Sequence, residues 1–129
     1  MLLTDLLNLD GPSGDEKPVR DRLREEALKY TDEVEVDALG NLYAIKRGKK
    51  SDGSPVMLCA HMDEIGFIVR GIREDGLVAY SPIGSVDPRV LPGKLVRLGA
   101  KRVTGVIGYK AVHLVSADEE KQAPKHEGL

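Results

Sequence analysis

The sequence predicts an α/β fold in which an N-terminal α/β region is followed by a small all-β region. Three observations favour this fold class: apolar residues recur at helical spacing near the N-terminus, strand-like patterns begin at Val34, and no helical pattern follows residue 66. The 129 residues suffice for one ordinary domain or two small ones. We therefore expect two regions, residues 1–66 and 67–115, and a polar linker or tail over residues 116–129.

Two helices are expected at the start of the chain. Leucines at helical spacing predict the first over residues 2–9, and the turn-forming residues 10–14 end it. Asp15 is expected to cap a second helix over about residues 16–30, with Pro18 in its first turn. The predicted buried face of this second helix consists of Val19, Leu23, Ala27 and Tyr30.

Three strands are expected in the rest of the first region. Val34 and Val36 alternate with acidic residues, and a second strand is predicted over residues 42–46. The continuous apolar run at residues 56–60 is typical of a strand that is covered on both faces. Cys59 lies in this run and is expected to be a small buried residue.

The second region is predicted to contain short strands only. Residues 67–72 and 77–80 flank a glycine turn and predict a hairpin, and further strands are expected over residues 95–98, 103–107 and 111–115. Five or more short strands at regular spacing suggest a small barrel or sandwich.

Composition excludes several classes of function. The 19 Lys and Arg residues are balanced by 21 Asp and Glu residues, which argues against a nucleic-acid partner. No apolar run approaches the roughly 20 residues of a membrane span, and the N-terminus lacks the basic start of a signal peptide. The single cysteine rules out an internal disulfide framework, so a cytoplasmic location is expected.

The strongest candidates for functional residues lie in residues 60–66, which follow the apolar run directly. His61 and Asp63 are two residues apart, so both side chains point to the same side of an extended backbone. Asp63 can then hold one imidazole nitrogen and leave the other free for a metal ion. The spacing alone leaves two alternatives open: a metal ligand, or an inert hydrogen-bonded histidine at a strand end.

The other candidates are weaker. His113 lies in a predicted strand, His126 lies in the polar tail, and Ser13 is interpreted as part of a turn that leads into a helix. A catalytic zinc needs about three protein ligands, so these residues alone do not build a hydrolytic metal centre.

The motifs taken together resemble one family. The sequence Ala-His-Met-Asp-Glu-Ile-Gly at residues 60–66 resembles the signature of the glutamyl-aminopeptidase and tetrahedral-aminopeptidase family, older members of which are labelled endoglucanases. The resemblance extends over nearly the whole chain, through residues 11–14, 18–20, 36–42, 84–93 and 105–108. Ser85 departs from it, since members commonly have glycine there.

This resemblance implies an α/β/α metallopeptidase domain interrupted by a small β-rich, PDZ-like domain that mediates dimerisation. It implies a cytosolic aminopeptidase that uses two divalent metal ions, zinc or cobalt, to cleave peptides, in assemblies from dimers to dodecamers. His61 matches a metal ligand, and Asp63 matches the catalytic-site aspartate that orients it. The family's bridging aspartate, its general-base glutamate and its other metal ligands match no residue of this sequence.

Two functions follow as hypotheses. In the first, the chain is the N-terminal part of a dinuclear aminopeptidase, inactive by itself and able to bind at most one ion weakly. In the second, it is a non-catalytic assembly module that pairs with itself or with a complementing C-terminal part. A glycosidase is disfavoured, because the chain has no Trp and a single Phe to stack on sugars.

Overall fold

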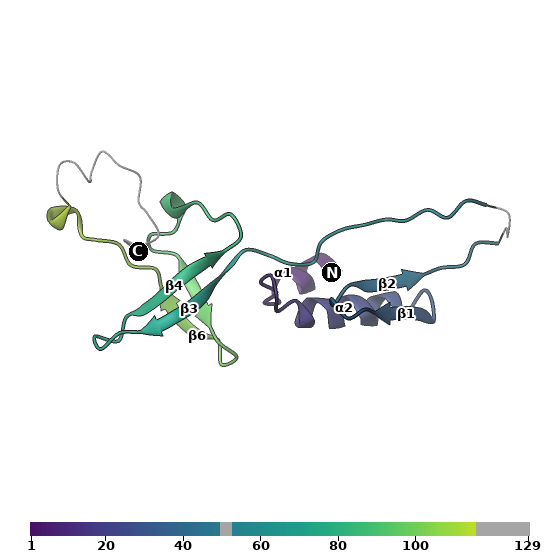
Figure 1. Cartoon of the computed structure of the whole chain (residues 1–129), viewed down its shortest axis with the longest axis horizontal. Coiled ribbons are helices and arrows are strands. Elements are labelled where there is room, and N and C mark those ends of the chain that lie inside the picture. Colours follow the sequence, from purple (N-terminus) through teal and green to yellow (C-terminus); the bar gives the residue numbers. More distant parts are fainter. Residues whose placement is uncertain (50–52, 116–129) are drawn as a thin grey trace. The chain divides into compact units, whose positions relative to one another are not determined.

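The computed structural model describes residues 1–49 and 53–115, and these fall into two compact units. The first unit is Met1–Gly66, and the second begins at Phe67. The first contains both α-helices and one hairpin, whereas the second contains short strands and two turns of 3₁₀ helix (Figure 1). No helix in the described part of the chain is long and apolar enough to cross a membrane. The predicted tail at residues 116–129 lies outside the described residues.

The two predicted helices are present, α1 at Leu2–Leu7 and α2 at Lys17–Ala27. The prediction that Asp15 caps α2 is wrong. Glu16 occupies the cap position and makes no side-chain bond into the helix, because its carboxylate accepts a hydrogen bond from the backbone of Gly14 (2.6 Å). Pro18 lies in the first turn, where its missing N–H costs nothing.

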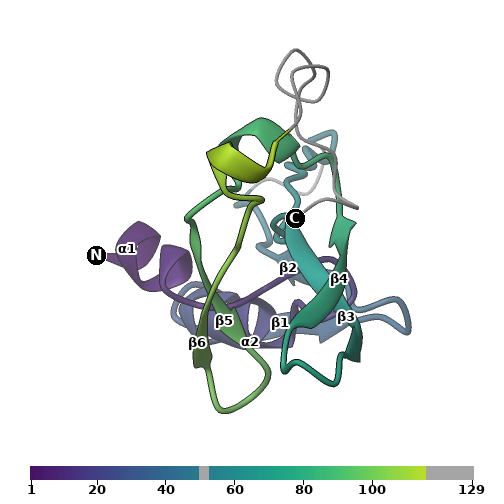
Figure 2. The ribbon, with the colours of Figure 1, turned by 90° about the vertical axis from the view of Figure 1, so that its left-hand side faces the viewer.

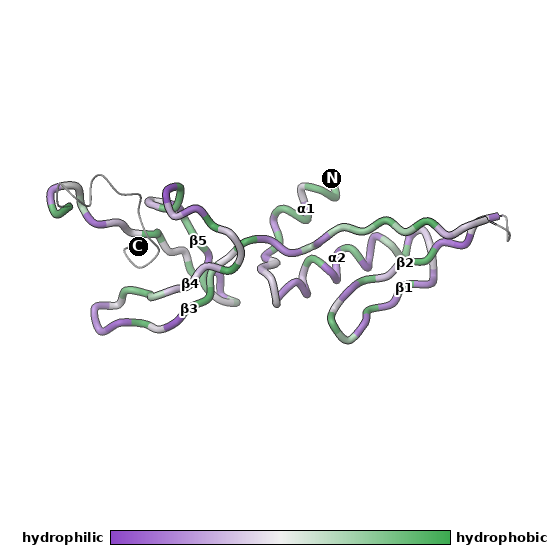
Figure 3. The backbone as a smooth tube through the Cα atoms, turned by 45° about the horizontal axis from the view of Figure 1, so that its top comes forward, coloured by the Kyte–Doolittle hydropathy of each residue, from purple (hydrophilic) through white to green (hydrophobic). Residues whose placement is uncertain are grey.

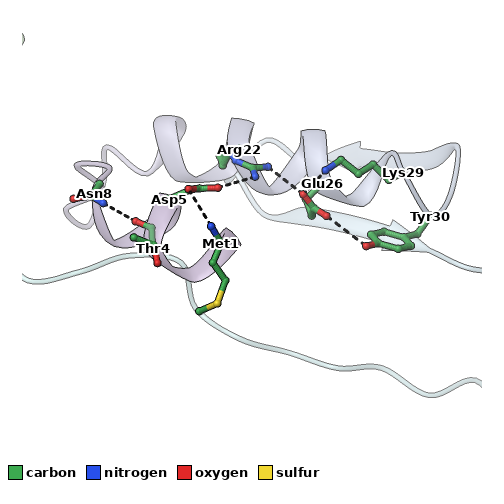
Figure 4. A network of polar contacts seen from close by, with 8 residues as sticks. All are labelled: Met1, Thr4, Asp5, Asn8, Arg22, Glu26, Lys29 and Tyr30. Atoms are coloured by element: carbon green, nitrogen blue, oxygen red, sulfur yellow. Dashed lines mark hydrogen bonds and ion pairs between the residues drawn. The ribbon is translucent and has the colours of Figure 1, made fainter.

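A chain of polar contacts, with the half-buried Arg22 and Glu26 at its centre, joins the two helices (Figure 4). The guanidinium of Arg22 donates to Asp5 of α1 (3.1 Å) and to Glu26 one turn further along α2 (3.3 Å). Glu26 also accepts from Lys29 (2.7 Å), and this bond is the largest cause of the lowered pKa of its carboxyl. Val19, one turn before Arg22 in the same helix, is the buried apolar residue of this unit among the described residues.

The first hairpin matches the prediction closely. Strand β1 (Glu33–Val36) pairs antiparallel with β2 (Leu42–Ile45), from Glu33 opposite Ile45 to Val36 opposite Leu42. The connecting turn is organised by Asp37, whose carboxylate accepts from the backbone of Leu39 (2.9 Å) and from the backbone and side chain of Asn41 (both 2.8 Å). The bond from the Asn41 side chain is the main reason that the pKa of Asp37 is lowered.

The predicted covered strand at residues 56–60 is not observed. The segment is extended, but it forms no ladder with any described strand, and it is a largely hydrophobic stretch of exposed chain (Figure 3). Leu58 is 93% exposed, and Cys59 is exposed where a buried thiol was expected. A continuous apolar pattern specifies a strand only when neighbouring strands and helices cover it, and the described residues provide none.

The second unit contains two separate pairs of strands (Figure 2). Strand β3 (Gly66–Ile72) pairs with β4 (Val78–Ile83), and β5 (Leu95–Leu98) pairs antiparallel with β6 (Val103–Val106). A 3₁₀ turn at Pro88–Val90 lies between β4 and β5, capped by Asp87. The strand predicted over residues 111–115 is wrong, since Val112–Leu114 forms a second 3₁₀ turn.

A small apolar core joins the two sheets of this unit. Val86, Leu91 and Ile107 are its buried members, and Phe67, Tyr80 and Val96 pack against them. Phe67 and Tyr80 meet edge to face, with ring centroids 4.8 Å apart. Burial raises the pKa of the Tyr80 phenol, and its hydroxyl lacks a hydrogen-bond partner among the described residues. The sheets therefore meet through side chains, and no ladder among the described strands closes the predicted barrel.

Leu91 should carry much of the stability of the second unit, because its side chain is 6% exposed at the centre of this core. We expect Leu91→Ala to lower the free energy of unfolding by about 2 kcal/mol, the low end for a buried leucine in a small core. Urea denaturation monitored by tyrosine fluorescence measures the change. Leu95→Ala is the matched control, because Leu95 is 72% exposed, and it should change stability by less than about 0.5 kcal/mol. An equal loss of unfolding free energy in both variants would contradict the placement of Leu91 in the core.

Asp37 should make the hairpin sensitive to acid. Its pKa is depressed in the folded chain, so its contribution to stability is present above the unfolded pKa of about 3.9 and is lost as the pH falls through the folded value. Asp37→Asn should therefore be less stable than the wild type near neutral pH, and the difference should disappear in strong acid. The measurement is the urea midpoint as a function of pH. Glu35→Gln, which neutralises a carboxylate in the same hairpin, should show no comparable pH-dependent difference.

Candidate metal-ligand site

His61 and Asp63 make the contact that their spacing predicts. The Nδ1 atom of His61 lies 3.0 Å from the Asp63 carboxylate oxygen Oδ1 and 3.0 Å from the backbone oxygen of Asp63. Both neighbours accept hydrogen bonds, so in the neutral ring the proton belongs on Nδ1. The other ring nitrogen, Nε2, then carries the lone pair. It makes no hydrogen bond to the described residues, and the side chain is 85% exposed.

The second oxygen of the Asp63 carboxylate is held by a residue that sequence analysis assigned only to a turn. Ser13 Oγ donates to Asp63 Oδ2 at 2.5 Å. The two residues are 50 positions apart, and no periodicity or local motif pairs them. The bond from Ser13 is the largest cause of the lowered pKa of Asp63, followed by the bond with His61. Asp63 is therefore an anion at neutral pH, with both oxygens engaged.

Backbone pairing brings Ser13 to Asp63. The amide of Glu64 donates to the carbonyl of Gly11 (2.9 Å), the amide of Gly11 donates to the Glu64 carboxylate (3.4 Å), and Pro12 forms an isolated parallel bridge with Glu64. The approach is close, since a Cβ atom added to Gly66 would lie 2.9 Å from Cβ of Pro12. This paired stretch, residues 11–13 against residues 63–66, holds Ser13 next to the Asp63 carboxylate.

His61 and Asp63 open onto a shallow cleft of about 170 Å³ within the first unit. Loop residues between β1 and β2 and the cap of α2 form the rest of its wall. The lining residues are Glu16, Leu39, Gly40, Asn41, Ala60, His61, Met62 and Asp63. The cleft is open and mainly polar, so it suits a small hydrophilic ligand or an ion and gives little apolar surface for a larger molecule.

The residues present fit a metal ion only in part. His61 has the tautomer and carboxylate support of a metal-ligating histidine. However, no group of three or more His, Cys, Asp or Glu side chains in the described ranges is arranged to hold an ion. His113 lies exposed in the second 3₁₀ turn, and His126 falls outside the described residues. His61 is thus a single competent donor, and its role as a ligand stays a prediction.

Comparison with known sequences identifies one family, the same family that the sequence motifs resemble. The sequence profile of the M42 glutamyl aminopeptidase family matches residues 40–129. A protein from Acetivibrio thermocellus described as a putative aminopeptidase is 38% identical over 109 residues, which are 84% of this chain and 32% of that protein. The chain thus spans about a third of the length of the curated relatives that it matches.

Solved structures agree in fold. A structure titled endoglucanase from Thermotoga maritima is 46% identical, with a TM-score of 0.76 over 84% of this chain and 34% of that one. A TET aminopeptidase from a Thaumarchaeota archaeon is 34% identical, with a TM-score of 0.86 over 98% of this chain and 35% of that one. A Pyrococcus horikoshii TET1 peptidase, 30% identical with a TM-score of 0.69 over 97% of this chain and 37% of that one, is described as assembling into a tetrahedron or a large octahedral shell.

Gly66 should be essential for the paired stretch. In Gly66→Ala the new methyl group would lie 2.9 Å from Pro12, so the two segments must move apart, at a cost of about 1 kcal/mol or more. Amide hydrogen exchange of Glu64 should accelerate, because its bond to Gly11 weakens. Gly71→Ala is the matched control in the same strand, since a Cβ there meets nothing within 4 Å. Unchanged exchange of Glu64 in Gly66→Ala would show that the pairing is not close-packed.

Proposed function

Because the chain belongs to the M42 glutamyl aminopeptidase family, we propose that it is the N-terminal part of a metal-dependent aminopeptidase that removes N-terminal residues from peptides. The observation that carries the proposal is His61, whose Nδ1 is occupied by Asp63 while Nε2 stays available to a metal. That arrangement follows directly after an extended segment and lines an open cleft, where a peptide end has access.

The proposed cofactor is a pair of divalent ions, zinc or cobalt, which when bound polarise the scissile carbonyl and lower the pKa of a water molecule. His61 would hold one of the ions through Nε2. Asp63 would hold the imidazole in the required tautomer and orientation. The other ligands and the general base would come from the remaining two thirds of a protein as long as the relatives.

The chain by itself is proposed to be inactive, because one histidine donor does not complete a hydrolytic centre. Purified chain should therefore not hydrolyse aminoacyl anilides. Residues 1–66 would contribute to the catalytic domain, and residues 67–115 would form the inserted PDZ-like dimerisation domain. Residues 116–129 would be the linker that returns to the catalytic domain. The cytoplasm is the proposed location.

A second function is favoured by the exposed apolar segment at residues 56–60, in which Val56, Met57 and Leu58 are all highly exposed. Such a surface is typical of a site that another polypeptide covers. In this alternative the chain is a non-catalytic assembly module, which pairs with copies of itself or with a complementing C-terminal part. Light scattering of the purified chain tests this alternative. A well-behaved monomer in the absence of any added partner would contradict the assembly module.

Metal binding tests the proposal directly. We expect the chain to bind at most one Zn²⁺ ion, weakly, and His61→Ala to abolish that binding because it removes the only competent donor in the described site. Asp63→Ala should weaken it about 10- to 100-fold, the usual effect of removing a carboxylate that supports a histidine ligand. Isothermal titration calorimetry measures both.

His113→Ala is the matched control, since His113 is exposed and lies in the other unit. Two results would contradict the proposal: Zn²⁺ binding that survives His61→Ala unchanged, or hydrolysis of aminoacyl anilides by the pure chain.

A further inference from the structure

We propose that Ser13 is a positioning residue for His61: its hydroxyl anchors the Asp63 carboxylate, which in turn holds the imidazole with Nε2 free for a divalent metal ion. The inference rests on the proposed function, because it assigns Ser13 a role toward the same ion. The sequence suggested only a turn at this position, and the contact becomes visible when residues 11–13 lie against residues 63–66.

The two oxygens of Asp63 have different partners. Oδ2 accepts from Ser13 (2.5 Å), and Oδ1 lies 3.0 Å from Nδ1 of His61. Rotation of the carboxylate about its Cβ–Cγ bond would disturb both contacts together. With Oδ2 anchored, Oδ1 is kept in the direction of the imidazole, and the ring loses rotational freedom although it is 85% exposed. An exposed histidine without this anchor would sample several rotamers.

Ser13 is itself fixed by the backbone around it. The carbonyl of Pro12 accepts from the amide of Asp15 (2.8 Å), which closes the turn, and Pro12 is bridged to Glu64. On the helix side, Gly11 lies so close to Val19 that an added Cβ would come within 2.6 Å of its methyl group. The serine hydroxyl is therefore presented to Asp63 by a turn held against both α2 and the segment that carries the site.

A hydroxyl group is chemically suited to this position. It donates one hydrogen bond to the carboxylate but adds no charge, so the negative charge of Asp63 remains to polarise the imidazole. A lysine or arginine there would neutralise Asp63 and place a positive charge near the ion. Ser13 does not reach His61 directly, and it acts only through Asp63.

The test uses ¹⁵N NMR of the histidine side chains in the whole chain, at a pH at which imidazole is neutral, with Zn²⁺ absent. The wild type should show His61 mainly as the Nδ1–H tautomer, and Ser13→Ala should reduce that fraction while the backbone amide spectrum stays native. Ser13→Thr, which keeps the hydroxyl, should restore it. Ser54→Ala removes an exposed serine elsewhere in the unit and should change nothing.

A second variant leaves Ser13 in place and decides the question even if Ser13→Ala does not fold. In Asp63→Asn, a donating Ser13 should hold the amide oxygen and turn the amide NH₂ group toward His61. The Nδ1–H tautomer should then decrease, because a donor now opposes that nitrogen. If Ser13 exerts no hold, the amide is free to present its oxygen to His61 and the tautomer stays as in the wild type, which would overturn the inference.

Zn²⁺ titration then tests whether the contact between Ser13 and Asp63 affects metal binding. Ser13→Ala should weaken Zn²⁺ binding by about tenfold, the low end for groups outside the ligand set, and Ser13→Thr should recover it. Failure of the two proposals can be told apart. Zn²⁺ binding that survives His61→Ala unchanged contradicts the proposed function, whereas an unchanged His61 tautomer in Ser13→Ala contradicts the role of Ser13, whatever the metal does.

Discussion

The candidate site depends on one long-range contact, the pairing of the Gly11–Gly14 turn with the segment that follows His61. Two hydrogen bonds between Gly11 and Glu64, one between backbone groups and one from the Gly11 amide to the Glu64 carboxylate, place two stretches side by side that are more than 50 residues apart in sequence. This approach requires small residues, because Gly11 lies against Val19 and Gly66 lies against Pro12 without room for a side chain. Without that contact, the His61–Asp63 pair would remain, but the Asp63 carboxylate would lose its anchor at Ser13.

Hydrogen bonds, more than apolar burial, organise the first unit. Its one buried hydrophobic residue in the described ranges is Val19, whereas the second unit has a cluster of three. The Asp37 turn, the Arg22 contacts and the Ser13–Asp63–His61 chain are each a set of local or paired polar contacts. Exposed hydrogen bonds contribute little net stability each, so the geometry of such a unit is sensitive to the loss of single donors.

The family assignment and this geometry support each other at different levels. The relatives and solved structures place the chain among M42 aminopeptidases, in a portion equal to about a third of their length. The structure adds an exposed histidine whose Nδ1 lies 3.0 Å from a carboxylate oxygen, and an apolar segment that no described residue covers. Both features are what the proposed function expects of a part whose partners lie on other polypeptide.

Local patterns in the sequence determined the elements whose contacts are local. Helix α2, the β1–β2 and β3–β4 hairpins and the His61–Asp63 contact were predictable, because each depends on residues within a few positions or across one turn. Only the tertiary structure decided the fate of residues 56–60 and the role of Ser13. An apolar run becomes a covered strand only if neighbours exist, and a serine finds a carboxylate 50 residues away only when the backbone brings them together.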